Sequence, residues 1–239
     1  MKSSIKLVSL LTGAALLGGC GGGSMAVRPE LKAQVQSIAL IRVAEPPAYV
    51  ANDFGNPGMM FGAVGGTAVG AGAMTAGEKI TKIAHDAGFS AADRYTSALE
   101  TKLRASGYQV KIVDAARPKP GKLLGDYAAV DAQGADAILD IAVESFGYAT
   151  EHPMFSPHWR PAAQVKVAMV SRTTQEVVYQ EKFMYGYHNP LMSGTDLDAP
   201  ETFHFKNRDA LFADEAKLVE GLNSSVDAVV QAIGTHLAK

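Results

Sequence analysis

The amino-acid sequence predicts an α/β (α+β) fold, a single mixed sheet with packed helices, plus a glycine-zipper segment. Three observations lead to this prediction. Short apolar runs rich in branched residues alternate with amphipathic stretches. Two of the later runs are separated by only three residues, as in a hairpin. The chain then closes with a long stretch whose apolar residues recur at helical spacing.

The strands are expected where branched and aromatic residues concentrate. Residues 37–43 form a short apolar run that ends at Pro46 and Pro47, which is typical of a buried strand. Residues 108–113 and 137–148 are expected to form two more strands. Residues 164–172 and 176–187 are expected to pair as a hairpin about Thr173-Thr174-Gln175.

Three helices are expected between and after these strands. The clearest covers residues 90–106, because Ser90 and Asp93 resemble a capping box and Gly107 follows its end. A short helix is expected over residues 123–133, ending at Gly134. The last covers residues 209–237, and its apolar face consists of Leu211, Leu218, Leu222, Val226, Val229, Ile233 and Leu237.

The first nineteen residues have the order of parts of a secretion signal. Lys2 and Lys6 give a short basic stretch, and residues 7–17 form an uncharged apolar run. The run is too short to span a bilayer as a helix, which needs ~20 apolar residues. We therefore expect residues 1–19 to be removed.

Leu17-Gly18-Gly19-Cys20 follows this run and resembles the lipobox of bacterial lipoproteins. The resemblance implies that Cys20 receives a diacylglycerol, that the leader is cut before it, and that the new amino group is acylated. Two or more acyl chains give stable membrane anchoring, whereas one gives only marginal binding. Cys20 is the only cysteine, so it has no disulfide partner within the chain. The alternative is an ordinary signal with a chance cysteine.

Gly21 follows the cysteine at the position where many inner-membrane lipoproteins of enteric bacteria carry Asp. We therefore expect a location on the outer membrane, lipid-anchored and facing the periplasm. Residues 21–29 read as a flexible tether. The expected organisation is a lipoprotein signal peptide at 1–19, the lipidated cysteine and tether at 20–36, and one periplasmic domain at 37–239.

The charge balance argues against nucleic acid as a partner. The chain has 22 basic and 24 acidic residues, and removal of Lys2 and Lys6 leaves 20 against 24, a net charge of about −4. A nucleic-acid surface needs clustered Lys and Arg, and no such cluster runs along a face.

Several expected elements together resemble a family of periplasmic lipoproteins. They are the opening strand at 37–43, the helix closed by Gly107-Tyr108, the strand entry at 134–139, and the 173–179 hairpin that leads to Gly186. Their order is similar to that in lipoproteins with the fold of the TolB amino-terminal domain, a group that includes CsgG and LpoB. The resemblance covers roughly residues 37–239 and implies a role in envelope assembly or secretion. The secretion-channel relatives carry long membrane-spanning hairpins, and no comparable alternating stretch is obvious here.

A glycine stripe lies in residues 58–77. Gly58, Gly62, Gly66 and Gly70 stand four residues apart, and the run between Asp53 and Glu78 has no charge. On a helix these glycines would form a groove that another backbone could approach closely. Such a helix would reach ~36 Å, enough to cross a hydrocarbon core of ~30 Å, but each glycine costs up to ~1 kcal/mol relative to alanine. Three interpretations remain open: packing against the protein's own sheet or a neighbouring helix, self-association or membrane contact, and a mobile loop.

No motif in the chain predicts catalysis, and we expect neither a cofactor nor a metal. There is no G-x-S-x-G, and no histidine pair has the spacing of a zinc motif. His152 and His158 could meet in a loop, but loop histidines without a ligand role are commoner. Asp196, Asp198 and Asp209 fit solvated loop acids.

The loop predicted at 152–161 holds the only tryptophan, Trp159, and joins two predicted strands. Aromatic side chains with a polar tip are common at partner surfaces, so Trp159 is the best candidate for a partner contact. In the alternative interpretation, Phe146, Phe183 and Tyr185 belong to the core and Trp159 covers a sheet edge.

These observations predict a non-catalytic, lipid-anchored periplasmic protein that binds or assembles another cell-envelope component. Its expected partners are the membrane, through the acyl chains on Cys20, and an envelope protein that the sequence does not identify. The alternative function is that of a subunit in an oligomeric envelope or secretion complex that uses the glycine zipper for self-association or membrane contact. Homo-oligomer contacts would then involve Gly58, Gly62, Gly66 and Gly70.

Overall fold

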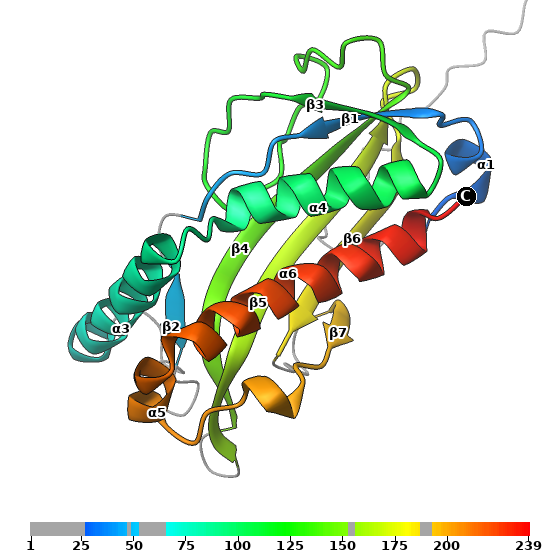
Figure 1. Cartoon of the computed structure of the whole chain (residues 1–239). Coiled ribbons are helices and arrows are strands. Elements are labelled where there is room, and N and C mark those ends of the chain that lie inside the picture. The colour runs from blue at the N-terminus through cyan, green and yellow to red at the C-terminus, as the bar shows by residue number, and fades with distance from the viewer. Residues whose placement is uncertain (1–26, 47–48, 53–65, 153–155, 187–192) are drawn as a thin grey trace, which may run out of the picture.

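Seven strands form one mixed sheet in the computed structural model, which describes residues 27–46, 49–52, 66–152, 156–186 and 193–239 (Figure 1). The strand order is β3-β1-β4-β5-β6-β7, and β2 pairs with β4 beyond the end of β1. The strands are β1 (Ser37–Ile41), β2 (Val50–Asn52), β3 (Gln109–Val113), β4 (Ala137–His152), β5 (Ser156–Ser171), β6 (Val177–Tyr185) and β7 (Thr195–Leu197). The predicted α/β class with a single mixed sheet is confirmed.

The strands pair in both senses. β1 is parallel to β3 and β4, β2 is parallel to β4, and β7 is parallel to β6. β4, β5 and β6 are antiparallel neighbours. The predicted hairpin between β5 and β6 is confirmed, and Gln175 in its turn has a φ of 57°.

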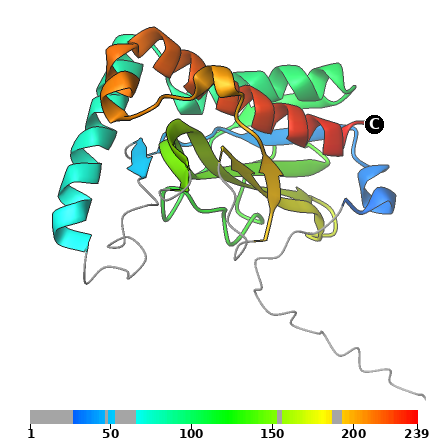
Figure 2. The same ribbon diagram turned by 90° about the horizontal axis from the view of Figure 1, so that it is seen from below.

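Helices α4, α5 and α6 lie on one face of the sheet, which we call the helix face, whereas α3 extends past one end of the sheet and α1 lies at the other end (Figure 2). Two of them, α4 and α6, lie side by side across the strands and contact β3, β5 and β6. The helices are α1 (Pro29–Lys32), α3 (Gly66–Asp86), α4 (Ala91–Ala105), α5 (Arg208–Ala213) and α6 (Glu215–Leu237), with a 3-10 turn η2 (Glu201–Phe203) before α5. None of the described helices is both long and apolar enough to cross a membrane.

The caps predicted for α4 are present. The Ser90 side chain accepts a hydrogen bond from the Asp93 backbone N–H at 3.2 Å, which satisfies one donor of the first turn. Gly107 ends the helix with a φ of 88°, a conformation that costs glycine little.

The predicted apolar face of the closing helix is buried in full, but the helix is interrupted. All seven residues are fully buried: Leu211, Leu218, Leu222, Val226, Val229, Ile233 and Leu237. Asp214 separates α5 from α6, and its side chain accepts a hydrogen bond from the Lys217 N–H at 3.1 Å. An aspartate in this position is favoured as the N-cap of a new helix and disfavoured in the interior of a continuous helix. Two helices therefore replace the continuous one predicted over residues 209–237.

The opposite face, which we call the loop face, is covered in part by the segment between β3 and β4. The helix predicted at 123–133 is wrong, because this segment forms turns. Asp126 and Asp131 each accept a hydrogen bond from the backbone N–H two residues on, an arrangement that competes with helix formation. The Leu124 N–H donates to Asp140 on β4 instead of to a helical carbonyl. Apolar side chains of this segment still pack on the loop face. They belong to a cluster that also includes residues of β1, β3 and β4: Ala39, Ile41, Val113, Leu124, Val130, Ala132, Ala135 and Ile138.

The folded part of the chain extends further toward the N-terminus than predicted. Arg28 donates its N–H to the Val178 carbonyl at 2.9 Å, and Val35 is buried. α1 lies between these two residues. Part of residues 27–36, predicted to be the last part of the tether, therefore packs against the domain.

Candidate functional site

The predicted site residues fall in different parts of the chain. Cys20, Gly58 and Gly62 lie outside the described residues. Gly66 and Gly70 lie in the first turns of α3, so the loop interpretation does not hold for this part of the stripe. The stripe of four glycines is not described as one unit.

Gly77, two turns after Gly70 in α3, shows why a glycine is needed there. A Cβ atom at Gly77 would lie 2.3 Å from the Tyr49 carbonyl oxygen, far inside van der Waals contact. The helix thus approaches the backbone just before β2 more closely than any other residue would permit. At this position the segment packs against the protein's own chain.

Trp159 lies in β5 rather than in a loop, because β4 and β5 are longer than predicted. Pro161 does not end the strand. Its carbonyl oxygen faces Gly186, on the side of β5 away from β4, and an N–H at this residue would point to the same side. The proline therefore removes no hydrogen bond between β5 and β4. The Trp159 side chain is 7% exposed and belongs to the main hydrophobic cluster. The structure therefore supports the core interpretation of Trp159 over that of a partner contact.

Trp159 forms a bridge with Phe205, a residue far along the chain. The two backbones exchange hydrogen bonds of 2.7 Å in both directions, which is the geometry of an antiparallel pair. Both aromatic side chains point into the core. Because side chains alternate along extended backbone, the residues on either side of each aromatic point to the other face.

This alternation creates the pocket that we call the bridge pocket. Its volume is about 750 Å³, and it is open to solvent. In the antiparallel pair, Arg160 stands beside His204, and His158 stands beside Lys206. The lining residues are His158, Arg160, Asp198, Ala199, Glu201, His204 and Lys206.

The electrostatics of the bridge pocket centre on His204. Burial lowers the pKa of His204, and the nearby Arg160 lowers it further. A contact of 3.2 Å between His204 Nε2 and the Ala199 carbonyl, together with the charge of Glu201, opposes this shift only in part. His204 is therefore neutral at neutral pH, and Arg160 and Lys206 carry the positive charge, balanced by Asp198 and Glu201.

Sequence reasoning missed the pocket as a group. His158-Trp159-Arg160 and His204-Phe205-Lys206 share the pattern histidine, aromatic, cation, which is a usable signal. This pattern becomes informative only once the two tripeptides are known to pair in the fold, because two tripeptides far apart in the sequence need not lie in one site. The pocket brings His158 together with His204 and Lys206.

The other histidines lie elsewhere. His85 is in α3, and His236 is in α6, where its Nδ1 lies 3.0 Å from the Tyr179 hydroxyl. His152 ends β4, and His188 lies outside the described residues. Within the described ranges, no three His, Cys, Asp or Glu side chains are placed to hold a metal ion.

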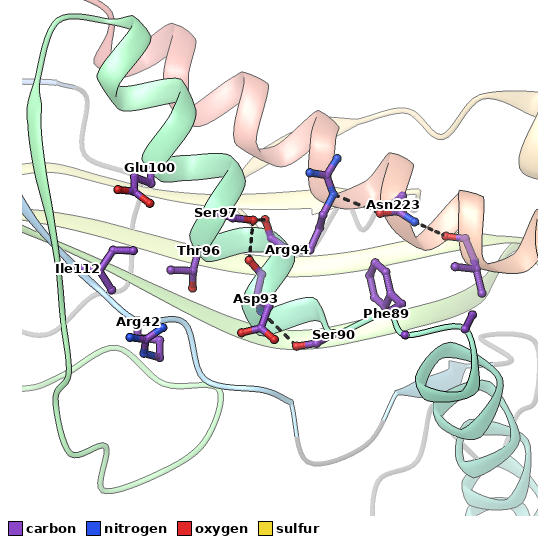
Figure 3. Close-up of a pocket in the computed structure, with 13 residues that line it drawn as sticks. Arg42, Phe89, Ser90, Asp93, Arg94, Thr96, Ser97, Glu100, Ile112 and Asn223 are labelled. Atoms are coloured by element: carbon purple, nitrogen blue, oxygen red, sulfur yellow. Dashed lines mark hydrogen bonds between the residues drawn. The ribbon is translucent and has the colours of Figure 1, made fainter.

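A second pocket of about 520 Å³ lies beside α4 (Figure 3). Its polar side chains are engaged within the fold: Arg94 donates to Asn223 at 3.2 Å and pairs with Asp227 at 2.5 Å, which joins α4 to α6. Ser90, another lining residue, donates its hydroxyl to the Glu45 carboxylate at 2.9 Å. These contacts give the second pocket a structural role, and the bridge pocket is the better candidate site.

The comparisons with known proteins give no family. No family model and no curated protein matches the sequence. Two solved structures of PelC dodecamers from Paraburkholderia phytofirmans are similar at low level, one of them a leucine-to-methionine variant. The variant is 14% identical with a TM-score of 0.37, and covers 91% of this chain and 96% of its own. The other is 13% identical with a TM-score of 0.38, and covers 90% and 94%. Similarity at this level supports no inference about function or assembly.

Proposed function

We propose that the protein is a lipid-anchored, non-catalytic component of a bacterial outer membrane that binds another envelope component on the periplasmic side. The observation that carries this proposal is the pattern at the N-terminus. A basic stretch, a short apolar run and Leu17-Gly18-Gly19-Cys20 follow one another without interruption. The resemblance to the TolB amino-terminal-domain group remains a prediction that agrees with this role.

The position of Val27, the first described residue, limits how far the domain can lie from the membrane. Six residues lie between Cys20 and Val27, and the seven Cα–Cα steps of a fully extended chain span at most ~25 Å. Arg28 is bonded to Val178 beside the β5–β6 turn, and Lys32 donates to the His236 carbonyl at 3.4 Å. In the anchored protein, the end of the domain that carries α1, the β5–β6 turn and the C-terminus would therefore lie within ~25 Å of the membrane. The end that carries α3 and α5 is the opposite one (Figure 1).

Replacing Cys20 with Ser tests the anchor. Without the thiol there is no site for the diacylglycerol, so we expect the Cys20→Ser protein to leave the membrane fraction or to accumulate unprocessed. Fractionation of cells and mass spectrometry of the N-terminus measure both outcomes. Ser24→Ala, a change of similar size in the tether, is the control and should stay in the membrane fraction. A Cys20→Ser protein that is still cut at the same site and still membrane-bound would contradict the proposal.

Self-association through α3 is the second candidate function. Its support is that Gly66 and Gly70 are helical and that Gly77 lies on the same side of the helix as Gly70, seven residues away. At Gly77 this side contacts the protein's own chain. The proposal is that the same side, further toward the start of α3, contacts a second copy.

Leucine substitutions along this segment separate the interpretations. If a backbone occupies the groove, Leu at Gly62, Gly66 or Gly70 should disrupt it far more than Leu at Ala63, Val64 or Ala71. Loss of oligomers at an unchanged melting temperature would indicate contact between subunits, and a lowered melting temperature of the monomer would indicate packing within the chain. Equal tolerance of Leu at Gly66 and Val64, in both stability and assembly, would refute any role of the glycine spacing.

A further inference from the structure

Two segments far apart in the sequence bring four side chains to the bridge pocket that carry or can acquire positive charge. They are His158 and Arg160 from β5, and His204 and Lys206 from the segment between η2 and α5. The Trp159–Phe205 bridge fixes their positions, because the hydrogen bonds on both sides of the aromatic pair set the register of the two segments. The bridge thus fixes the backbone positions from which the four side chains enter the pocket, so that a bound ligand has to order only the side chains.

We propose that the bridge pocket binds the phosphoryl group of a phosphorylated small molecule or headgroup. A phosphoryl group presents three strong acceptor oxygens, and donors from several directions suit it better than they suit a planar carboxylate. The Arg160 guanidinium provides a planar fork of donors, and the Lys206 ammonium provides a mobile one. The two imidazoles add further donors.

The acidic side chains of the pocket determine at which pH it binds such an anion most tightly. Asp198 and Glu201 offset the charges of Arg160 and Lys206 while His204 is neutral. Protonation of His204 adds a positive charge to the pocket. The charged and titratable groups that face or adjoin His204 are His158 and Arg160 on β5, Asp198 and Glu201 before it, Lys206 after it, and Lys217 on α6, whose Nζ donates to the His204 carbonyl at 3.1 Å.

The direction of the pH effect follows from the lowered pKa of His204. The folded protein resists protonation of this residue, whereas the unfolded chain takes up the proton at about pH 6.5. The unliganded domain therefore loses stability as the pH falls from about 6.5 toward the lower folded value. A bound anion favours the protonated imidazole, so anion affinity should rise over the same interval.

The experiment uses the full-length protein as it is expressed, purified in detergent, with Trp159 as the reporter. Because the chain has one tryptophan, whose backbone lies between His158 and Arg160, its fluorescence reports on changes in the strand segment that lines this pocket. Titration with inorganic phosphate should give a saturable change, and KCl at equal ionic strength should not. The site goes beyond the proposed function and does not depend on it, since the titration needs no membrane attachment.

Matched variants assign the signal to the pocket. His158 and Lys206 are exposed, so His158→Gln and Lys206→Gln should leave the fold intact, as a melting curve can verify. Each should weaken phosphate binding about tenfold, the loss expected for one charge-assisted contact. The control variants His85→Gln and Lys119→Gln remove the same groups outside the pocket and should bind phosphate as the unaltered protein does.

Sulfate tests the role of His204, because it stays doubly negative over the interval in which binding should change. Sulfate should bind more tightly at about pH 6 than at about pH 8, and this difference should be smaller in His204→Gln. Glucose 6-phosphate and glycerol 3-phosphate then distinguish a saccharide source of the phosphoryl group from a lipid headgroup. A response that KCl reproduces, or equal phosphate affinity of the pocket variants and the control variants, would overturn the proposal.

Discussion

The two faces of the sheet are buried by different means. On the helix face, apolar side chains of α4 and α6 cover the strands, and tyrosine hydroxyls such as that of Tyr148, which donates to the Leu218 carbonyl at 2.8 Å, complete the contact. On the loop face, the apolar cluster is smaller and charged side chains fill the remaining area. Burial of apolar area does not depend on pH and is not screened by salt, whereas a buried charge is stable only with its partners in place.

The best-buried charge on the loop face is Asp140, which is fully buried. It pairs with Arg117 at 2.5 Å, accepts the Leu124 N–H at 2.8 Å and accepts the Tyr127 hydroxyl at 3.0 Å. These three partners all come from the segment between β3 and β4. Asp140 therefore holds in place the loop that covers its own face.

Of the substitutions that test this difference between the two faces, Asp140→Ala should cause the largest loss of stability. The substitution leaves the Arg117 guanidinium buried without its carboxylate, and we expect a loss of about 3–5 kcal/mol in the free energy of unfolding, measured with urea. The double variant Arg117→Met/Asp140→Leu removes both charges and should recover most of this loss.

Leu222→Ala on the helix face provides the comparison. It should cost about 2–5 kcal/mol through the cavity that it leaves, with no dependence on salt or pH, and the exposed Glu220→Ala should cost little. If Asp140→Ala cost no more than Glu220→Ala, the loop face would not depend on this ion pair.

A smaller effect should appear at Glu144, also on β4. Three lysines surround its carboxylate: Lys122 at 3.0 Å, Lys166 at 2.9 Å and Lys182 at 3.9 Å, with Gln164 as a further donor. Burial raises the pKa of Glu144, but the hydrogen bonds from Lys166, Lys122 and Gln164 outweigh it and lower the pKa to about 2.

The lowered pKa of Glu144 predicts an acid-dependent loss of stability. The folded protein keeps the carboxylate charged, whereas the unfolded chain takes up a proton near pH 4.5, so this contribution is present above pH 4.5 and is lost as the pH falls toward 2. Urea unfolding at a series of pH values should show a decline over this interval that is weaker in Glu144→Gln. Because Lys122 is well exposed, added salt should reduce the effect. An identical pH profile in Glu144→Gln would show that the lysines do not act through this carboxylate.

The regular elements could be predicted where local and tertiary preferences agree. The cap at Ser90, the glycine at Gly107 and the turn at 173–175 have local causes, and each is present. The helix expected at 123–133 failed because its apolar spacing fits a covering loop equally well, and because the aspartates supply turn contacts that spacing does not reveal.

The candidate site could not be predicted in the same way. His158 and His204 are separated by most of β5, all of β6 and β7, and η2, and nothing local relates them. Trp159 was expected in a loop between two strands. It lies in a strand because β5 continues its pairing with β4 through Pro161, whose missing N–H would point away from β4.

The sequence by itself determined the fold class, the hairpin, the caps of α4 and the apolar face of α5 and α6, since each depends on residues that are close in the chain or repeat at a fixed period. Only the tertiary structure decided that α3 approaches the backbone at Tyr49 through Gly77, that Asp140 gathers its partners from the loop, and that two histidine-aromatic-cation tripeptides face each other. The physical reason is that these contacts join segments whose distance in space is set by the pairing of whole strands, and no local pattern encodes that distance.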